Sequence, residues 1–332
     1  MDKLVVFATS FLDKLDTHPD GEGRGKSILD DLEQSGVCTV EYRCTRDPRT
    51  PLAPADLDGV TAVIADLELY EEHLLSEVGV GSGGSLRLIA RYGVGTNSVD
   101  IASATRHGIL VANTPGANSI PTAEWSVATI LDVAGRRIPH HRRSSHGLVK
   151  EGRSRLDVSG RTLGVIGTGR VGRNVIRLMS GFGMTVIACD IAPDAEWAEA
   201  TGVTYVTLDE LCRRADIITL HTSSTEEVVT SRHLDMMKPT TALINCARGY
   251  QVDNEAAYAA VKDGRLFGYG LDEIWNYEQL PLDGLNITVS PHIGSDTDSG
   301  KAGMQTMSAE AVRDYLQGDR PEFVVNPEVL VG

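Results

Sequence analysis

The sequence lacks paired cysteines, long apolar runs and an excess of basic residues. Its five cysteines are scattered, and no Cys-x-x-Cys occurs, which argues against a disulfide framework and favours reduced thiols in the cytoplasm. No run approaches the roughly 18 apolar residues of a membrane span, and the first apolar run is too short for a signal peptide. The net charge is −15, from 46 acidic and 31 basic residues, which argues against a nucleic-acid partner.

Short apolar runs alternate instead with helical patterns along most of the 332 residues. Continuous apolar strands separated by helices predict parallel sheets covered on both faces. At about 150 residues per domain, the length suggests roughly two domains. The predicted strands are 3–8, 37–42, 60–65, 86–90, 108–112, 162–167, 184–189, 216–221, 241–246, 266–272 and 286–291.

The segment 113–160 interrupts this pattern and separates two α/β blocks. It begins with turn residues and becomes helical after Pro121, a residue that suits a first helical turn. A polar stretch follows that we interpret as a helical arm; no acid or cysteine completes a ligand set with its adjacent histidines, so no metal site is predicted. The tail 301–317 is again helical, with Gly318 as its C-cap, and it is predicted to return to the first block.

A glycine-rich loop follows the strand at 162–167. Gly167, Gly169 and Gly172 form G-x-G-x-x-G, and a helix follows. In this context the first glycine permits a tight turn, the second lets the backbone approach a pyrophosphate, and the third allows close packing of helix and strand. The helix N-terminus favours the anion. The loop therefore predicts a dinucleotide site, although S-adenosylmethionine enzymes share part of the pattern.

The next strand ends on Asp190, near the expected spacing of about 20 residues from the loop. Its carboxylate would accept hydrogen bonds from the ribose hydroxyls and repel a 2′-phosphate. No arginine follows it in the sequence "DIAPDAE". The sequence therefore favours NAD over NADP.

Three residues stand at the ends of later predicted strands: Arg248, Asp272 and His292. Ligands of open parallel sheets bind beyond the carboxyl ends of the strands, so these side chains should converge near a nicotinamide. Each alone has an ordinary structural interpretation, as an ion pair, a helix cap or a loop histidine. Together, and after a dinucleotide loop, they indicate a reaction site.

At these residues the sequence resembles the D-isomer-specific 2-hydroxyacid dehydrogenases, and the similarity covers nearly the whole chain. The resemblance implies an NAD-dependent oxidoreductase that acts on the CH–OH group of donors, working as a reductase of small 2-keto acids, and a homodimer. The matching pieces include "RYGVGTNSVD" (91–100), "GVIGTGRVG" (164–172), "NCARG" (245–249) and "SPHIG" (290–294).

The resemblance also implies two Rossmann/flavodoxin-like domains with parallel sheets. An NAD-binding domain, 116–297, would be inserted into a discontinuous substrate-binding domain, 1–115 and 298–332. A dimerisation arm would lie at about 121–158.

Carried over position by position, Arg248 would hold the substrate carboxylate with its planar fork and polarise the carbonyl. His292 would exchange a proton with the carbonyl oxygen. The backbone amides of Gly93, Val94 and Gly95 resemble the family's carboxylate-binding loop. The implied cofactor contacts are Gly167, Gly169, Arg170, Val171, Gly172, Asp190, Thr122, His221, Thr222, Cys246, Asp272 and Gly294.

One departure concerns the acid that hydrogen-bonds the catalytic imidazole in this family and raises its pKa. Direct counting places Tyr277 at that position, and Glu278 follows it. We favour Glu278 as the partner of His292. The alternative is that Glu278 is an exposed loop acid and that the histidine has another partner or none.

Two other functions stay open. An NAD(H)-binding regulatory module with little turnover would resemble the C-terminal-binding-protein corepressors, but this chain has no evident partner-recruiting tail and keeps both Arg248 and His292. A formate or phosphite dehydrogenase shares the fold, but the sequence at 91–97 resembles the hydroxyacid loop. The chain ends soon after "NPEVL" (326–330), so no appended regulatory domain is expected. The sequence does not specify the side chain of the 2-keto acid.

Overall fold

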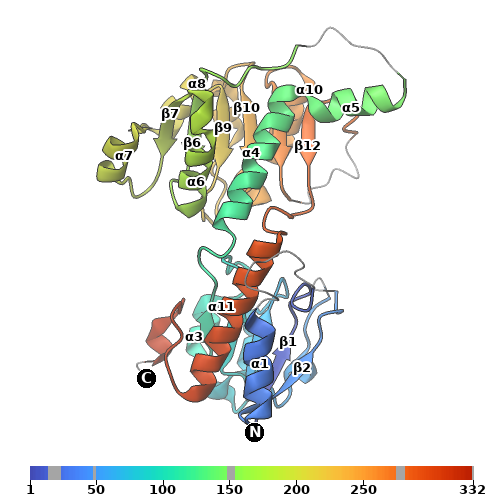
Figure 1. The fold of residues 1–332 in the computed structure, drawn as a ribbon, viewed down its shortest axis with the longest axis vertical. Helices are drawn as coiled ribbons and strands as arrows, with labels where there is room; N and C mark the ends of the chain where they lie inside the picture. Colours follow the sequence, from blue (N-terminus) through green and yellow to red (C-terminus); the bar gives the residue numbers. More distant parts are fainter. Residues whose placement is uncertain (14–23, 48–49, 148–153, 274–280, 331–332) are drawn as a thin grey trace. The chain divides into compact units, whose positions relative to one another are not determined.

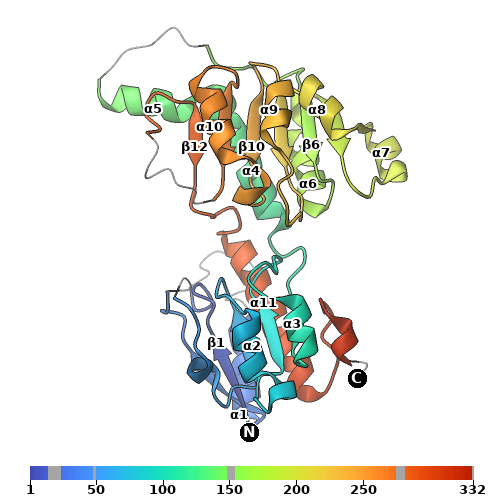
Figure 2. The same cartoon turned by 180° about the vertical axis from the view of Figure 1, so that it is seen from behind.

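The computed structural model describes residues 1–13, 24–47, 50–147, 154–273 and 281–330. The chain divides into two compact units: unit 1 comprises Met1–Asn118 and Asp296–Gly332, and unit 2 comprises Ser119–Ser295. Each unit is built on one parallel sheet with helices on both faces (Figures 1 and 2). The predicted α/β class with two parallel sheets is confirmed.

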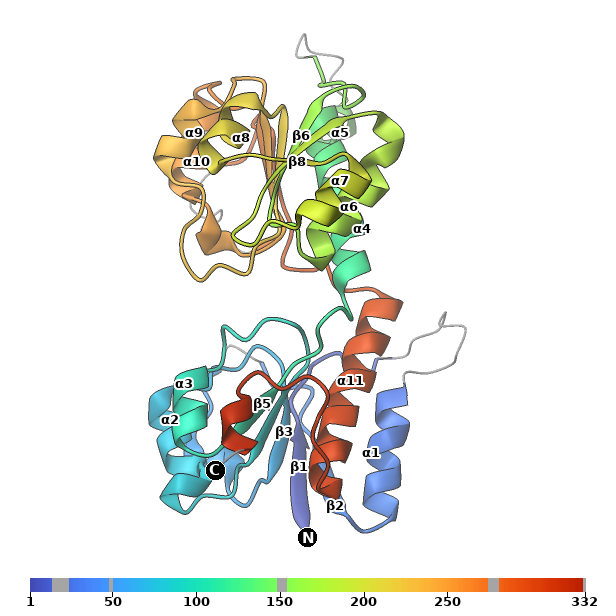
Figure 3. The ribbon, with the colours of Figure 1, turned by 90° about the vertical axis from the view of Figure 1, so that its left-hand side faces the viewer.

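The sheet of unit 1 has the order β2-β1-β3-β4-β5, which is the flavodoxin-like order. Helices α1 and α11 cover one face, and α2 and α3 cover the other (Figure 3). The strands are β1 Asp2–Val6, β2 Cys38–Tyr42, β3 Ala62–Ala65, β4 Leu88–Arg91 and β5 Leu110–Ala112. The helices are α1 Arg24–Gln34, α2 Glu72–Val78, α3 Ile101–Arg106 and α11 Asp298–Gln317.

Helix α11 joins the C-terminal segment to unit 1 through close packing on α1. A side chain at Gly25 would overlap the backbone carbonyl of Gln305, so the glycine is what allows the two helices to approach. The Thr297 hydroxyl caps the start of α11 by accepting a hydrogen bond from the Gly300 amide at 3.1 Å. Gly318 ends the helix in the left-handed conformation, with φ 84°, as predicted.

The sheet of unit 2 has the order β12-β11-β10-β9-β6-β7-β8. Counted from β6, this is the doubly wound order 3-2-1-4-5-6 with one further strand, and it reverses between β6 and β9. The strands are β6 Thr162–Ile166, β7 Thr185–Cys189, β8 Thr204–Tyr205, β9 Ile217–Leu220, β10 Ala242–Asn245, β11 Gly268–Leu271 and β12 Ile287–Val289. The eleven predicted strands are all present, and among the strands that the structure describes only the two-residue β8 was not predicted.

Helices α4, α6 and α7 lie on one face of this sheet, and α8, α9 and α10 lie on the other (Figure 3). Their bounds are α4 Ser119–Gly135, α5 Arg137–Ser145, α6 Arg170–Met179, α7 Ala195–Thr201, α8 Leu208–Arg214, α9 Ser231–Met236 and α10 Asn254–Lys262. Helix α4 begins two residues before Pro121 rather than after it, because first-turn residues need no intrahelical acceptor for their N–H groups.

Short 3-10 helices complete the fold at Pro54–Leu57, Val80–Ser82, Ser180–Phe182, Gly249–Gln251 and Pro327–Leu330. Of the helices that the structure describes, none is both long and apolar enough to cross a bilayer.

Candidate active site

The glycine loop lies where the strand order of unit 2 reverses. A Cβ atom on Gly167, whose φ is 92°, would lie 2.7 Å from the carbonyl oxygen of His221. A Cβ on Gly172 would overlap the carbonyl oxygen of Gly167. The fold itself therefore requires these two glycines.

Gly169 differs, because no atom lies within 4 Å of the place its Cβ would occupy. It is the N-cap of α6 and makes no side-chain capping hydrogen bond, so the N–H groups of the first turn have no intrahelical acceptor. Arg170 is exposed and Val171 is half-buried. The open space and the donors of this turn suit a phosphate group.

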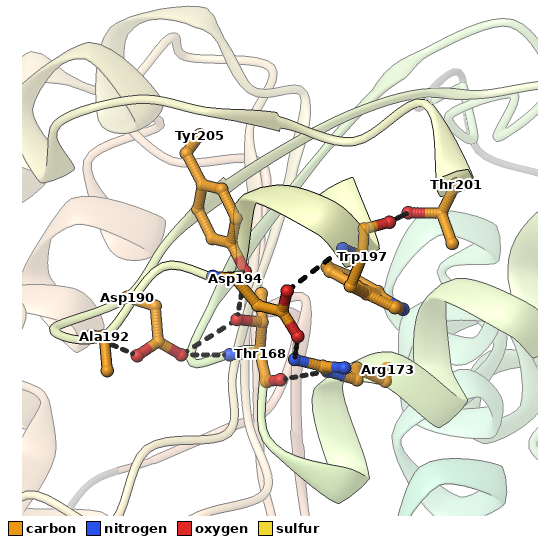
Figure 4. A network of polar contacts seen from close by, with 8 residues as sticks. All are labelled: Thr168, Arg173, Asp190, Ala192, Asp194, Trp197, Thr201 and Tyr205. Atoms are coloured by element: carbon orange, nitrogen blue, oxygen red, sulfur yellow. Dashed lines mark hydrogen bonds and ion pairs between the residues drawn. The ribbon is translucent and has the colours of Figure 1, made fainter. Parts of the chain in front are cut away.

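Asp190 is held against the loop by hydrogen bonds (Figure 4). Its Oδ2 accepts from the amide and hydroxyl of Thr168 at 2.6 and 2.9 Å, and its Oδ1 accepts from the Ala192 amide at 2.9 Å. Partial burial opposes ionisation of this carboxyl group, but the hydrogen bonds outweigh it and hold its pKa below the usual range. Asp190 therefore stays ionised and can accept a hydrogen bond from a ligand.

His221 follows β9 on the other side of the reversal point. Its Nε2 lies 2.9 Å from the Thr219 hydroxyl, while its buried Nδ1 has no hydrogen-bond partner among the described residues. Burial lowers the pKa of His221 to about 3, so the ring is neutral at physiological pH. An unpartnered buried nitrogen is a place where a ligand group would restore a hydrogen bond.

The loop after His221 is fixed by a residue that sequence reasoning missed. Gln251 is fully buried, and its side-chain amide donates to the Ser224 carbonyl at 2.7 Å. The Thr222 hydroxyl accepts from the Ser224 amide at 3.0 Å. No sequence pattern marks Gln251, because its partner lies 27 residues away.

Arg248 follows β10, and the turn that carries it is held by Asn245. The Asn245 side chain donates to the Arg248 carbonyl at 2.8 Å and accepts from the Ala247 amide at 3.0 Å. The guanidinium donates to the Ala247 carbonyl at 2.7 Å. Within the described part of the chain it has no carboxylate partner, so the structural ion pair considered above is not formed there.

Glu273 is a second residue that the sequence analysis missed. Its Oε2 accepts from the Gly249 amide at 2.5 Å, so a carboxylate from the segment after β11 fixes the turn directly after Arg248. A Cβ on Gly249 would lie 3.3 Å from the same oxygen, which shows that this glycine makes room for Glu273. The only sequence signal was an acid directly after Asp272.

Asp272 directly follows β11 and is buried. Its Oδ1 accepts from the Ser290 hydroxyl at 2.5 Å and from the Ile293 amide at 3.0 Å, and its Oδ2 accepts from the Gly294 amide at 2.8 Å. These bonds clamp the loop that carries His292. A Cβ on Gly294 would lie 2.8 Å from the same Oδ2, so the glycine is required for the clamp.

His292 is exposed and has φ 59°, one of two non-glycine residues with positive φ in the described chain. This conformation is uncommon and is found at functional sites. Because β10, β11 and β12 are adjacent and parallel, Arg248, Asp272 and His292 follow neighbouring strands at one edge of the sheet. Glu278 lies outside the described residues, so its pairing with His292 stays a prediction.

The remaining predicted cofactor contacts of unit 2 lie on or beside α4. Thr122 is half-buried in the first turns of this helix. The Cys246 thiol is buried, and burial raises its pKa to about 12, with Ser126 and Thr129 of α4 as neighbours. A thiol with this pKa is unreactive, so Cys246 offers only its backbone to a ligand.

All three carbonyl groups of the loop Gly93–Gly95 in unit 1 accept hydrogen bonds from the same unit. The Gly93 oxygen accepts from the Thr114 amide at 3.1 Å, the Val94 oxygen from the Asn113 side chain at 2.8 Å, and the Gly95 oxygen from Arg91 Nε at 3.1 Å. The three amides have no acceptor among the residues the structure describes. Successive free amides of this kind suit an anion.

The neighbouring loop after β3 has an inverted burial pattern that sequence analysis did not detect. Leu67 and Leu69 are each 55% exposed, whereas Glu68 between them is fully buried. Burial raises the pKa of Glu68. This loop is joined to the segment after Gly95 by the hydrogen bond from the Tyr70 amide to the Ser98 carbonyl, 2.7 Å. Leu67 and Leu69 of this loop therefore face solvent within unit 1.

Comparisons with known proteins agree with this arrangement. Residues 127–294 match the model of the "D-isomer specific 2-hydroxyacid dehydrogenase, NAD binding domain". A glyoxylate reductase of Korarchaeum cryptofilum is 35% identical over 325 residues, 91% of this chain and 96% of that protein. A D-3-phosphoglycerate dehydrogenase of Synechocystis is 32% identical over 312 residues, 90% of this chain and 55% of that protein, so this chain spans about half the length of that relative. The crystal structure of Aquifex aeolicus D-lactate dehydrogenase complexed with NAD and lactic acid is similar to this chain, with a TM-score of 0.79. The two share 25% sequence identity, and the match covers 98% of this chain and 99% of that one.

Proposed function

The chain belongs to the D-isomer-specific 2-hydroxyacid dehydrogenase family, and from this premise we propose that it transfers a hydride between NADH and a small 2-keto acid. The observation that carries the proposal is the arrangement of unit 2. Arg248 follows β10 and His292 follows β12, with only β11 between these two strands, in the same sheet whose glycine loop has the open space and donors that suit a dinucleotide. An arginine fork, a proton donor and a cofactor loop are the parts that reduction of a keto acid needs.

The residues present fit NAD, which when bound supplies or accepts the hydride. The open side of Gly169 and the amides of the α6 N-terminus would hold the pyrophosphate. The ionised Asp190 would accept a hydrogen bond from a ribose hydroxyl. The unpartnered Nδ1 of His221 would bond a polar group of the cofactor.

The chain's own residues would then act on the substrate. Arg248 would bind the carboxylate and polarise the carbonyl, because its fork keeps its charge at any working pH. As the family resemblance implies, the amides of Gly93, Val94 and Gly95 would bind a substrate carboxylate. His292 would give a proton to the carbonyl oxygen in reduction and take it back in oxidation. Asp272 would hold the histidine loop in place, and Glu278 would be the partner of the imidazole.

The side-chain preference follows from the loop after β3. Leu67, Leu69 and the 39%-exposed Val94 are apolar and exposed, and neither 66–70 nor 93–97 contains a lysine or arginine. The Arg91 guanidinium is turned inward, with Nη1 3.1 Å from the Ala65 carbonyl. We therefore propose an uncharged, apolar side chain, because a phosphorylated keto acid would meet no cation in these loops.

The test is NADH oxidation with a panel of 2-keto acids, from glyoxylate through branched apolar acids to phosphohydroxypyruvate. We expect turnover with uncharged acids and little with the phosphorylated one. Tight NADH binding without turnover of any acid would support the regulatory-module alternative instead. Turnover of formate or phosphite alone would support the other dehydrogenase class.

We also propose that the protein is a cytoplasmic homodimer that associates through the arm at about 121–158. Helix α5 of this arm has no buried residue within the single chain, so its surface is available to a partner subunit. The five cysteines are unpaired, which fits a reducing compartment. Light scattering of the intact protein measures the mass directly, and a monomeric mass would contradict the proposal.

A further inference from the structure

A second charged pair lies beside the glycine loop, and the role proposed for Asp190 does not explain it. Arg173 of α6 donates from Nε to the Thr168 carbonyl and from Nη2 to Asp194 Oδ2, both at 2.8 Å. Its guanidinium carbon lies 4.4 Å from the centroid of the Trp197 ring. The arginine is thus held from three directions (Figure 4).

Thr168 connects this pair to Asp190. Its amide and hydroxyl bind Asp190, while its carbonyl accepts from Arg173. Its hydroxyl also lies 2.7 Å from the Tyr205 hydroxyl, which accepts from the Asp194 amide at 3.3 Å. Figure 4 shows Asp190 and Arg173 on opposite sides of this one residue. The Arg173 guanidinium and the Asp190 carboxylate that would bind the ribose therefore contact the same residue, Thr168.

Asp194 is also held in this position because it is the N-cap residue of α7. Its Oδ1 accepts from the Trp197 amide at 3.0 Å and caps α7. The Trp197 amide and the Arg173 side chain hold the pKa of Asp194 below its usual range, so it is ionised at neutral pH. The Arg173–Asp194 pair is partly exposed, with side-chain exposures of 37% and 41%, and pairs of this kind contribute little to stability.

We propose that Asp194 is a specificity-determining residue that keeps Arg173 engaged and so prevents it from binding a 2′-phosphate. The proposal rests on the proposed function. In the native chain Asp190 repels the phosphate and Asp194 occupies the arginine that would attract it. With both carboxylates removed, Arg173 would be released next to the ribose position, and a phosphate is a strong partner for a guanidinium.

Serine substitutions test this without removing the helix cap, because serine is itself a good N-cap residue. Dissociation constants of NADH and NADPH are measured by fluorescence titration for the native protein, Asp190→Ser, Asp194→Ser and the double variant. We expect Asp190→Ser alone to bind NADPH modestly better, and the double variant to bind it about tenfold more tightly again. Arg173→Gln in the double variant should abolish that second gain.

The matched control is Asp235→Ser, which removes a similar exposed carboxylate that pairs with Arg265 on the same unit at 3.0 Å. Combined with Asp190→Ser, it should leave NADPH affinity unchanged. Equal gains from Asp194→Ser and Asp235→Ser would reduce the effect to net charge and overturn the proposal, as would a gain that survives Arg173→Gln. If the native protein binds NADH but Asp194→Ser adds no Arg173-dependent NADPH affinity to Asp190→Ser, only the present inference is refuted. If the native protein binds neither dinucleotide, the proposed function is refuted too.

Discussion

The two units are built on the same plan but place different chemistry at the carboxyl edge of the sheet. In unit 2 that edge carries charged or titratable side chains, namely Asp190, His221, Arg248, Asp272 and His292. In unit 1 it carries free backbone amides and exposed leucines, and the acid between those leucines, Glu68, is buried. Under the proposed function, unit 2 would supply the chemistry and the cofactor contacts, while unit 1 would select the substrate.

The glycines of the two units differ in the same way. Gly167 and Gly172 are required because backbone atoms already occupy the place of a side chain. Gly93 has φ 143°, but the nearest atom to its Cβ position is the Met304 sulfur at 4.0 Å. One loop is therefore fixed by packing, and the other only by its backbone conformation.

The largest effect should come from the side chains of unit 2. His292→Asn should lower kcat/KM for a keto acid by about 10²–10⁴-fold, because it removes the proton donor, and it should leave NADH affinity unchanged. Steady-state kinetics and NADH titration measure the two quantities. The control is His73→Asn, an exposed histidine of unit 1. Full activity of His292→Asn would remove unit 2 as the source of the chemistry.

Arg248→Gln should reduce kcat/KM by about 10²–10³-fold, because a neutral amide cannot replace the charged fork. The exposed Arg265→Gln is the matched control in the same unit. An equal loss in both variants would point to stability rather than to substrate binding.

The glycine contrast predicts different failures in the two units. Gly172→Ala should destabilise unit 2 by about 3 kcal/mol, because the new methyl group would overlap backbone. Gly93→Ala should cost about 1–2 kcal/mol through its backbone conformation and raise KM for the keto acid more than the dissociation constant of NADH. Thermal unfolding and kinetics measure both, with Gly181→Ala, which has no atom within 4 Å, as the control.

The buried titratable groups should give pH dependences of opposite sign. The pKa of His221 is about 3 in the folded chain and about 6.5 when unfolded, so the unfolded state binds more protons in this range and stability falls as pH falls from about 6.5. The pKa of Glu68 is raised by burial, so the folded state binds more protons and stability falls as pH rises above about 4.3.

Replacement of each group should remove its own slope. His221→Asn should remove the loss of stability that occurs as pH falls below about 6.5, and Glu68→Gln should remove the loss of stability that occurs as pH rises above about 4.3. Denaturant unfolding across a pH series measures both. If the two substitutions changed the pH dependence of the unfolding free energy in the same direction, these groups would not be buried as described.

The smallest effect concerns the side-chain preference of unit 1. Leu67→Ser should raise KM about tenfold for a branched apolar keto acid, because it removes apolar contact. It should change KM little for glyoxylate, which has no side chain to contact it. The exposed Leu12→Ser serves as control. If Leu67→Ser changed KM equally for both acids, this loop would not select the substrate side chain.

Much of the site was predictable because it is encoded locally. The apolar runs predicted every strand of three residues or more, and the glycine loop, Arg248, Asp272 and His292 each stand directly after such a run. The structure does not test their catalytic roles, which stay proposals. What the sequence missed depends on distant contacts: Glu273 binds Gly249 from 24 residues away, and Gln251 binds Ser224 from 27.

The sequence by itself determined the strands, their parallel arrangement and the order in which the polar residues follow them. These features follow from hydrophobic period and glycine placement, which are properties of chain neighbours. Only the tertiary structure decided that "DLELY" (66–70) would bury its glutamate and expose its leucines, and that Asp194 would hold Arg173 beside Thr168. The reason is that burial and hydrogen-bond partners depend on which strands become neighbours, and a residue's sequence surroundings do not specify that.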